Sequence, residues 1–197
     1  MGDGRFIAFA MRAISGSAPR RAPFGSDVHG VAVVEFSLVA LPLFALIAVI
    51  LEASLIVFAQ HRLDVSTERA ARLLRTGTFQ AGATGDDPVA RLRTAMCGGG
   101  FNMFRCADMR IDLTRTESFV PSQIAAPYDP KTFDWSAGFG ARFDCPAGNS
   151  VVSLRVAVPV LRPFRFLDFT GQAMPGGRQL LTSTMVFRTE GFEDRSC

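Results

Sequence analysis

The chain has 197 residues and a formal net charge of +3 at pH 7, with 21 Lys and Arg against 18 Asp and Glu. This small charge is scattered, without repeated basic and aromatic clusters, and so argues against a nucleic-acid-binding protein. Apolar residues make up 48% of the chain. The length suits one membrane-spanning segment followed by one soluble domain of about 120 residues.

The first 30 residues have the composition of an unstructured basic leader. They carry four Arg against two Asp, and residues 15–26 are rich in Ser, Pro, Gly and Ala. Such a segment buries too little apolar surface to fold by itself. A basic segment ahead of an apolar span favours a cytoplasmic N-terminus.

A long apolar run follows this leader, from Phe36 to Ala59, and its only interruptions are Ser37, Pro42, Glu52 and Ser54. As a helix the run would rise by about 36 Å, enough to cross a hydrocarbon core of about 30 Å. The next residues are polar but keep a helical period, through Leu63, Ala70, Leu73 and Leu74. We predict one long helix over 31–76, with a membrane span at about 36–59.

An alternative interpretation of the run is a cleaved secretory signal. Val57-Phe58-Ala59 fits the small-x-small pattern for cleavage before Gln60. The apolar run is, however, much longer than the core of such signals, which is about 7–15 residues. It also contains Glu52, and the helical period continues through the supposed cut. We therefore favour a retained helix.

Arginines on the far side of the span complicate its orientation, since they make that side at least as basic as the leader: Arg62, Arg69, Arg72 and Arg75. The positive-inside rule alone does not decide which side is cytoplasmic. We place the N-terminus in the cytoplasm because all the cysteines follow the span and favour an oxidising compartment. Large domains also translocate largely regardless of nearby charge.

The cysteines favour disulfides over free buried thiols, because they lie in a small domain beyond a membrane span: Cys97, Cys106, Cys145 and Cys197. Their spacing does not suit zinc, since there is no C-x-x-C and neither histidine lies in this domain. Three pairings are possible, and we favour Cys97–Cys106 with Cys145–Cys197. We expect no metal and no cofactor.

Residues 77–197 have the pattern of an α+β domain with a mostly antiparallel sheet. Asp87-Pro88 is a good N-cap and first-turn pair for a helix that ends near Met96. Apolar and polar residues alternate, as in half-buried strands, over residues 108–114, 152–160 and 181–188. Pro159 predicts that the second strand ends, or lies at a sheet edge, near that position.

Two parts of this domain lack a clear period. Residues 123–147 hold scattered aromatic residues, and we predict a long loop, at most with a short strand, tied down by Cys145. An aromatic cluster then stands between strands, and it packs in the core or forms an exposed partner-binding patch: Phe164, Phe166, Leu167 and Phe169.

The sequence gives little support for an enzyme. His29 and His61 fall on opposite sides of the predicted span, and no G-x-S-x-G or paired metal ligands occur. Asp108 and Asp112 fall on the polar side of a predicted strand, where a structural role is simpler than a catalytic pair. We predict no catalytic residues.

The start of the long helix resembles a known family. Gly30, four small apolar residues, Glu35 and Phe36 are similar to the cleavage region of type IV pilin-like proteins. With Ser-Leu-Val-Ala-Leu-Pro-Leu following at 37–43, the segment resembles the TadE-like family, pseudopilin-like membrane proteins of Tad/Flp tight-adherence pilus systems. The resemblance is strong over about Gly30–Gly77 and includes Glu52 and residues 68–72, with a further match at 187–192.

This resemblance implies a bacterial inner-membrane protein with a cytoplasmic leader and a periplasmic domain, acting in assembly of an adhesive pilus. A prepilin peptidase would cut between Gly30 and Val31. The new amine would lie about one turn from Glu35, whose carboxylate needs a partner in lipid. The implied partners are the peptidase, the helices of the pilin and of a sister pseudopilin, secretion-platform membrane proteins and the bilayer.

Four residues of the helix are assigned to assembly and helix contacts: Glu35, Phe36, Pro42 and Glu52. Pro42 would remove a backbone hydrogen bond and bend the helix. Glu52 would snorkel or pair with a basic group of a partner helix. In a plain signal anchor, Glu35 would instead sit in the headgroup region.

The alternative function is a signal-anchored periplasmic binding module of the cell envelope with no pilus role. Such a module needs only an anchor and would keep its leader. An uncut Gly30–Val31 bond therefore distinguishes it from a pseudopilin.

Overall fold

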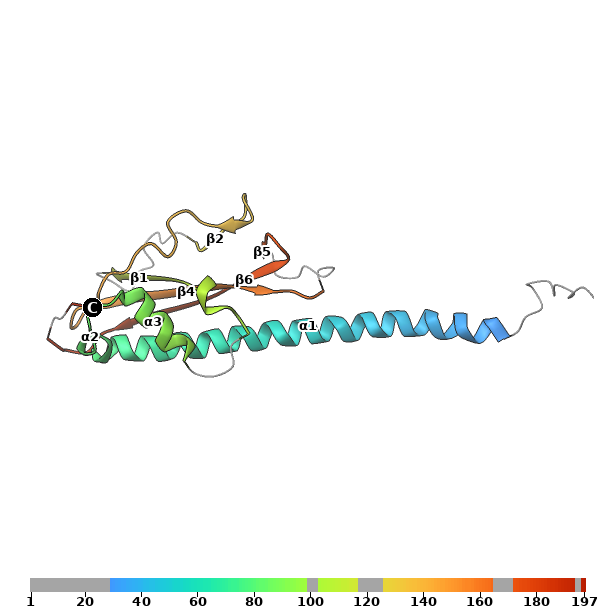
Figure 1. Ribbon diagram of the computed structural model, residues 1–197, viewed down its shortest axis with the longest axis horizontal. Helices are drawn as coiled ribbons and strands as arrows, with labels where there is room; N and C mark the ends of the chain where they lie inside the picture. The colour runs from blue at the N-terminus through green and yellow to red at the C-terminus, as the bar shows by residue number, and fades with distance from the viewer. Residues whose placement is uncertain (1–28, 99–102, 117–125, 165–171, 194–195) are drawn as a thin grey trace, which may run out of the picture. The chain divides into compact units, whose positions relative to one another are not determined.

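The computed structural model describes residues 29–98, 103–116, 126–164, 172–193 and 196–197, which are the coloured ribbons of Figure 1. Most of the predicted leader lies outside these residues, as do Phe166, Leu167 and Phe169 of the aromatic cluster. By its internal contacts the chain divides into two units, Met1–Phe44 and Ala45–Cys197.

The long helix is confirmed. Helix α1 runs without interruption over His29–Arg75, through Pro42, and starts two residues earlier than predicted. The hydroxyl groups in its apolar run bond within the helix, because Ser37 Oγ donates to the Val34 carbonyl at 2.8 Å and Ser54 Oγ to the Ile50 carbonyl at 2.7 Å. These polar residues therefore do not break it. The bend expected at Pro42 stays a prediction.

Helix α1 ends where a left-handed glycine turns the chain. Gly77 has φ 74°, and a Cβ at this position would lie 2.8 Å from the ring of Phe192. Only glycine fits both the backbone angle and the close approach. The Glu190 amide also donates to the Arg75 carbonyl at 2.9 Å. The C-terminal segment is thus fastened to the end of the helix.

The second unit contains the predicted antiparallel sheet, with strand order β1-β4-β6-β5. The strands are β1 Arg110–Thr116, β4 Val151–Leu161, β5 Ala173–Met174 and β6 Arg178–Arg188. Ile111 pairs with Val156, and Leu154 with Met185. The α+β prediction is confirmed, and its three alternating segments supply the three longest strands.

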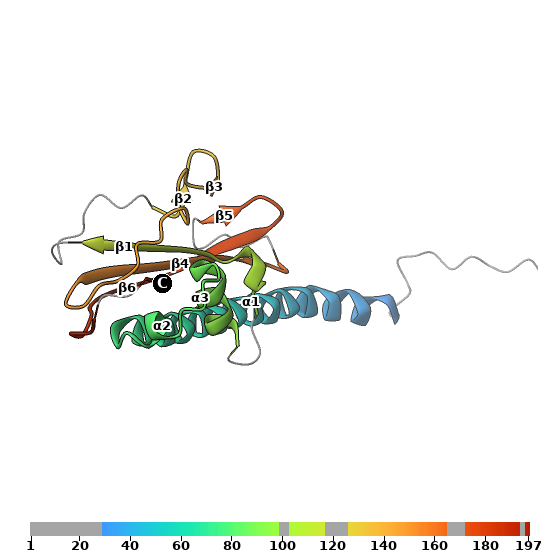
Figure 2. The same cartoon turned by 60° about the vertical axis from the view of Figure 1, so that its left-hand side comes forward.

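The two faces of this sheet are both covered, as Figure 2 shows. On one face pack α1 and α3 (Pro88–Cys97), with a core that includes Leu63, Leu74, Leu92, Ile111 and Leu154. On the other face lies a smaller cluster made by Tyr128, Phe139, Ala157, Met174 and Leu180, with Trp135 packed against it.

The covered second face bears on two predictions. Residues 126–147 hold two short strands where at most one was expected, since they form the hairpin of β2 (Tyr128–Asp129) and β3 (Asp134–Trp135), and they cover part of the sheet. Strands β1 and β4 are consequently buried on both faces for most of their length, and Asp112 is only 2% exposed. Asp108 also lies outside β1, in the short 3-10 helix η2 (Cys106–Asp108).

Pro159 does not end its strand. Strand β4 continues to Leu161 and pairs with β6 throughout, but its pairing with β1 stops at Ala157. Pro159 therefore lies where β4 has become an edge on the β1 side, a position that tolerates a missing amide hydrogen. The edge half of that prediction is correct.

Helix α3 forms where Asp87-Pro88 predicts it, and the Asp87 carboxylate accepts from the Val89 and Ala90 amides at 3.2 Å. A four-residue helix, α2 (Thr78–Ala81), precedes it. Disulfides join Cys97 to Cys106 and Cys145 to Cys197. The prediction of disulfides is confirmed, and this is the pairing we favoured.

Candidate functional site

The first half of α1 presents a run of exposed apolar side chains. In the first unit Phe36 is 71% exposed, and in the second unit Leu46, Ile47, Ile50 and Leu51 are all exposed. Soluble proteins rarely expose a continuous apolar surface of this kind. Among the described residues, α1 is the one helix long and apolar enough to cross a membrane.

The predicted cleavage site lies at the very start of this helix. Since α1 begins at His29, the Gly30–Val31 bond is in its first turn. Glu35 follows Val31 by one turn, on the exposed surface, and no ion pair is seen for it in the described part of the chain. Phe36 and Pro42 are exposed as well.

Glu52 is different, because its side chain is buried. It is 3% exposed, and its Oε1 accepts a hydrogen bond of 2.8 Å from Nε of Arg162, itself 7% exposed. Arg162 follows the last residue of β4, and its backbone amide donates to the Gly177 carbonyl at 3.1 Å. An acid in the apolar run of α1 is therefore joined to the end of the sheet.

Glu52 is also the first member of a buried stripe along α1. The stripe continues seven residues later at Ala59 and then at spacings of three and four through Leu63, Thr67, Ala70 and Leu74, the spacing of a helix face that packs on a core. Gln60 fixes the same face, since its Nε2 donates to the Thr182 carbonyl at 3.0 Å. At Glu52, α1 therefore changes from an uncovered apolar helix to one packed on the sheet.

The pair is not fully satisfied. Oε2 of Glu52 is buried and has no hydrogen-bond partner among the residues that the structure describes. A buried carboxylate needs its counter-ion far more than an exposed one does, because burial removes the water that would otherwise solvate the charge. The Glu52–Arg162 contact should therefore hold α1 and the sheet in one arrangement.

Arg162 was missed by the sequence analysis. Its one signal is its position, since it stands within the apolar stretch from Val156 to Phe164, where an unpaired charge would be costly. The contact joins residues 110 positions apart, and no local pattern could pair them. The contact predicted between Glu52 and a basic group of another helix stays a prediction.

Asp108 and Asp112 do not form a joint site. Asp108 lies 3.8 Å from Nε of Arg105 on the surface. Asp112 pairs across the strands with Arg155, beneath the hairpin side of the sheet. Burial lowers the pKa of the Arg155 guanidinium, an effect that nearby Asp112 opposes and Arg142 reinforces. Asp112 and Arg155 are therefore arranged as residues of a covered sheet face.

Comparison with known proteins gives one match. Residues 30–72 match the sequence model of the family described as TadE-like protein, about a fifth of the chain. A search of curated proteins and a search of solved structures found no significant match. The matched segment begins at Gly30 and includes both Glu35 and Glu52. Over this segment the chain matches the TadE-like family, which confirms the resemblance drawn from its sequence.

Proposed function

We propose that this protein is a pseudopilin-like structural component that acts in the assembly of a Tad-type pilus and is cleaved by a prepilin peptidase after Gly30. One coincidence carries the proposal. The segment that matches the TadE-like family, residues 30–72, contains the long apolar helix surface that is exposed in the part of the chain that the structure describes. Such a surface must be covered by lipid, by other helices, or first by lipid and later by other helices.

The proposed topology places residues 1–30 in the cytoplasm as a cleaved leader and residues 77–197 in the periplasm. The joining helix, 31–76, crosses the inner membrane. Two disulfides in the second unit support this orientation, since they persist only in an oxidising compartment. The apolar surface of α1 supports the membrane anchor.

The proposed mechanism is an exchange of environments for α1. In the membrane, lipid covers the uncovered apolar residues, and the Glu35 carboxylate is costly unless it has a partner. Cleavage creates an amine on Val31. When the helix leaves lipid for a stack of pilin and sister pseudopilin helices, Glu35 pairs with the amine of a neighbouring subunit. Secretion-platform membrane proteins drive the transfer, and the chain itself performs no catalysis.

Intact mass of membrane-extracted protein tests the cleavage. We expect a chain that starts at Val31 in cells with an active prepilin peptidase and a chain that starts at residue 1 in cells without it. Gly30→Phe should keep the leader, because the bulky side chain blocks the cut. Gly16→Phe, farther back in the leader, is the control and should be cleaved normally.

The alternative, a signal-anchored binding module of the cell envelope, makes the opposite prediction. Its leader would stay on the chain in both kinds of cell, and Gly30→Phe would have no effect. That result would overturn the pseudopilin proposal.

Glu35 provides a second test, at the stage after cleavage. Glu35→Leu should still reach the membrane and be cut, but pili should fall to a small fraction of their normal number because the amine has lost its partner. Pili are counted by electron microscopy and cleavage by intact mass. Glu68→Gln, an exposed acid of the same helix outside the apolar run, is the control. Normal pilus numbers with Glu35→Leu would contradict the proposed pairing.

A further inference from the structure

The sheet domain exposes few large apolar side chains. Away from α1, the exposed ones in the described parts of the chain are Phe133, Leu161, Phe164 and Val186. Two of them stand together after β4, where Leu161 is 72% exposed and Phe164 is 37% exposed. Pro163 between them is exposed too, whereas Arg162 is buried. We call Leu161, Pro163 and Phe164 the apolar rim.

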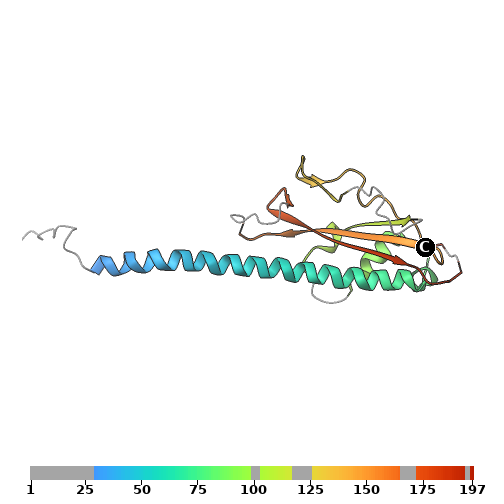
Figure 3. The same ribbon diagram turned by 180° about the vertical axis from the view of Figure 1, so that it is seen from behind.

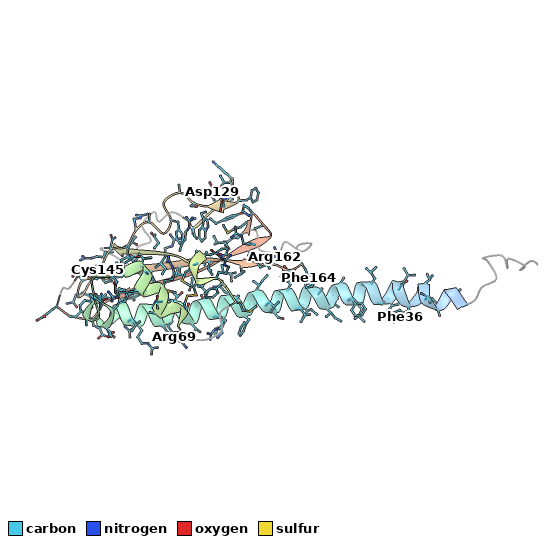
Figure 4. The ribbon with its side chains drawn as sticks, viewed as in Figure 1. Phe36, Arg69, Asp129, Cys145, Arg162 and Phe164 are labelled. Carbon is cyan, nitrogen blue, oxygen red and sulfur yellow. A yellow bond between two sulfur atoms is a disulfide. The ribbon has the colours of Figure 1, made fainter. Side chains whose placement is uncertain are left out.

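The Glu52–Arg162 ion pair determines where along α1 the apolar rim lies. Arg162 lies within the rim in sequence and contacts Glu52 at 2.8 Å. Figure 4 labels Arg162 and Phe164 at the end of the sheet domain next to α1, and Figure 3 shows the same end from behind. The rim therefore lies at about the level of Glu52 on the helix.

The apolar surface of α1 extends beyond that level toward the C-terminus. Leu55, Val57 and Phe58 are 42%, 68% and 47% exposed. Phe58 lies six residues after Glu52, a rise of about 9 Å along the helix. A bilayer that covers Phe58 on the open side of α1 must therefore also reach the apolar rim.

We infer that the apolar rim is a second membrane contact, in which Leu161, Pro163 and Phe164 enter the lipid interface beside α1. The occupant is the bilayer itself, because the rim continues the apolar surface of a helix suited to span that bilayer. The Glu52–Arg162 pair then lies at the level of the rim, about 9 Å along the helix from Phe58. This contact requires α1 in the membrane, but it does not depend on cleavage or on a pilus role.

The test places a fluorescent label at single positions of the full-length protein. Leu161→Cys is labelled with a nitrobenzoxadiazole dye under non-reducing conditions, so that the native disulfides stay closed. The protein is placed in nanodiscs of phosphatidylethanolamine and phosphatidylglycerol, with and without lipids that carry a nitroxide quencher. One set of lipids carries it near the headgroup end of the acyl chain, for the rim positions, and a second set near the middle of the chain, for a label at the centre of the span. Phe164→Cys serves as an independent second position.

Two matched positions give the comparison. Leu46→Cys on the uncovered helix should be quenched. Val186→Cys should not, because Val186 pairs with Ser153, eight residues along β4 from Leu161, a separation of about 26 Å. Val186 is 49% exposed, so it is as accessible to the dye as the rim.

We expect the labels at 161 and 164 to show blue-shifted emission and clear loss of fluorescence with the quencher lipids, as at 46. Labels at 161 and 164 that match 186 while 46 is quenched would overturn the inference. An unquenched label at 46 would overturn it too, since the helix would then not be in the bilayer. The cleavage experiment above is separate, so either proposal can fail without the other.

Discussion

Glu52 and Arg162 form the one ion pair in the described residues in which both side chains are buried. Removing one partner of such a pair leaves a charge without water or counter-ion, whereas replacing both by apolar groups often has little cost. An exposed pair behaves differently, because water solvates each charge when the other is lost. This contrast gives a test within the same chain.

Arg162→Met should lower the free energy of unfolding by about 3–5 kcal/mol, because it strands the Glu52 carboxylate. The double variant Glu52→Leu with Arg162→Met should recover most of that loss. Pulse proteolysis in urea, on the full-length protein in nanodiscs, measures both values.

The control for this prediction is Arg75→Met, which breaks the exposed pair of Arg75 with Glu190 at 3.9 Å. Its cost should be below about 1 kcal/mol. A cost for Arg162→Met no larger than that for Arg75→Met would show that the buried pair does not hold the helix on the sheet.

Of the two residues in the buried ion pair, the sequence indicated only one. Glu52 was conspicuous because an acid interrupts an apolar run, which is costly in lipid and in a protein core alike. Its partner was not predictable, because Arg162 comes from the far end of a strand whose register with α1 depends on the whole fold. Gly30 and Glu35 were recognised from a local motif and did not need that information.

The elements follow the local patterns closely wherever a pattern exists. The helical period predicted α1, and alternation predicted β1, β4 and β6 because side chains on a strand point to opposite faces. Alternation could not say whether the polar face meets water. Residues 126–147 have no period, yet Trp135 and Phe139 stack at 5.9 Å over the second face. Their aromatic content was the available signal, and it was assigned to a loop.

Helix α3 offers a prediction at the scale of one element. Asp87→Ala should lower the free energy of unfolding by about 1 kcal/mol, because it removes the acceptor of two amide groups in the first turn. Asp86→Ala is the matched control, since the Asp86 carboxylate accepts only from Thr84 Oγ1, at 2.7 Å on the exposed surface, among the bonds seen here. Urea unfolding measures both, and equal losses would contradict the capping role.

In the whole molecule, the match to a known family lies in the long helix and does not include the sheet domain. The family match ends at residue 72, before the strands begin, so it supports the anchor and the assembly role but not the task of the sheet. The sequence could predict the fold class of that domain from its alternation and its cysteines. What the domain contacts depends on surfaces assembled from distant segments, such as the apolar rim.

The two disulfides should differ in their effect on stability. Cys145–Cys197 spans 52 residues, whereas Cys97–Cys106 spans nine. If loop entropy dominates, removing the longer link by a double Cys→Ala change should cost about 1.5 kcal/mol more than removing the shorter one. Urea unfolding of the two double variants under identical conditions measures the difference. An equal or reversed order would show that native contacts outweigh chain entropy here.

The glycine turn at the end of α1 has a consequence for how the protein would display its sheet. Gly77 lies against Phe192, and the Arg75 carbonyl accepts from the Glu190 amide. Together with the Glu52 contact, these contacts prevent the sheet from rotating independently of the part of α1 on which it packs. An α-helix advances by about 100° per residue. If α1 packed against neighbouring helices in a register shifted by one residue, the sheet would therefore rotate by more than a quarter of a circle about the helix axis. A different face of the sheet would then point outward.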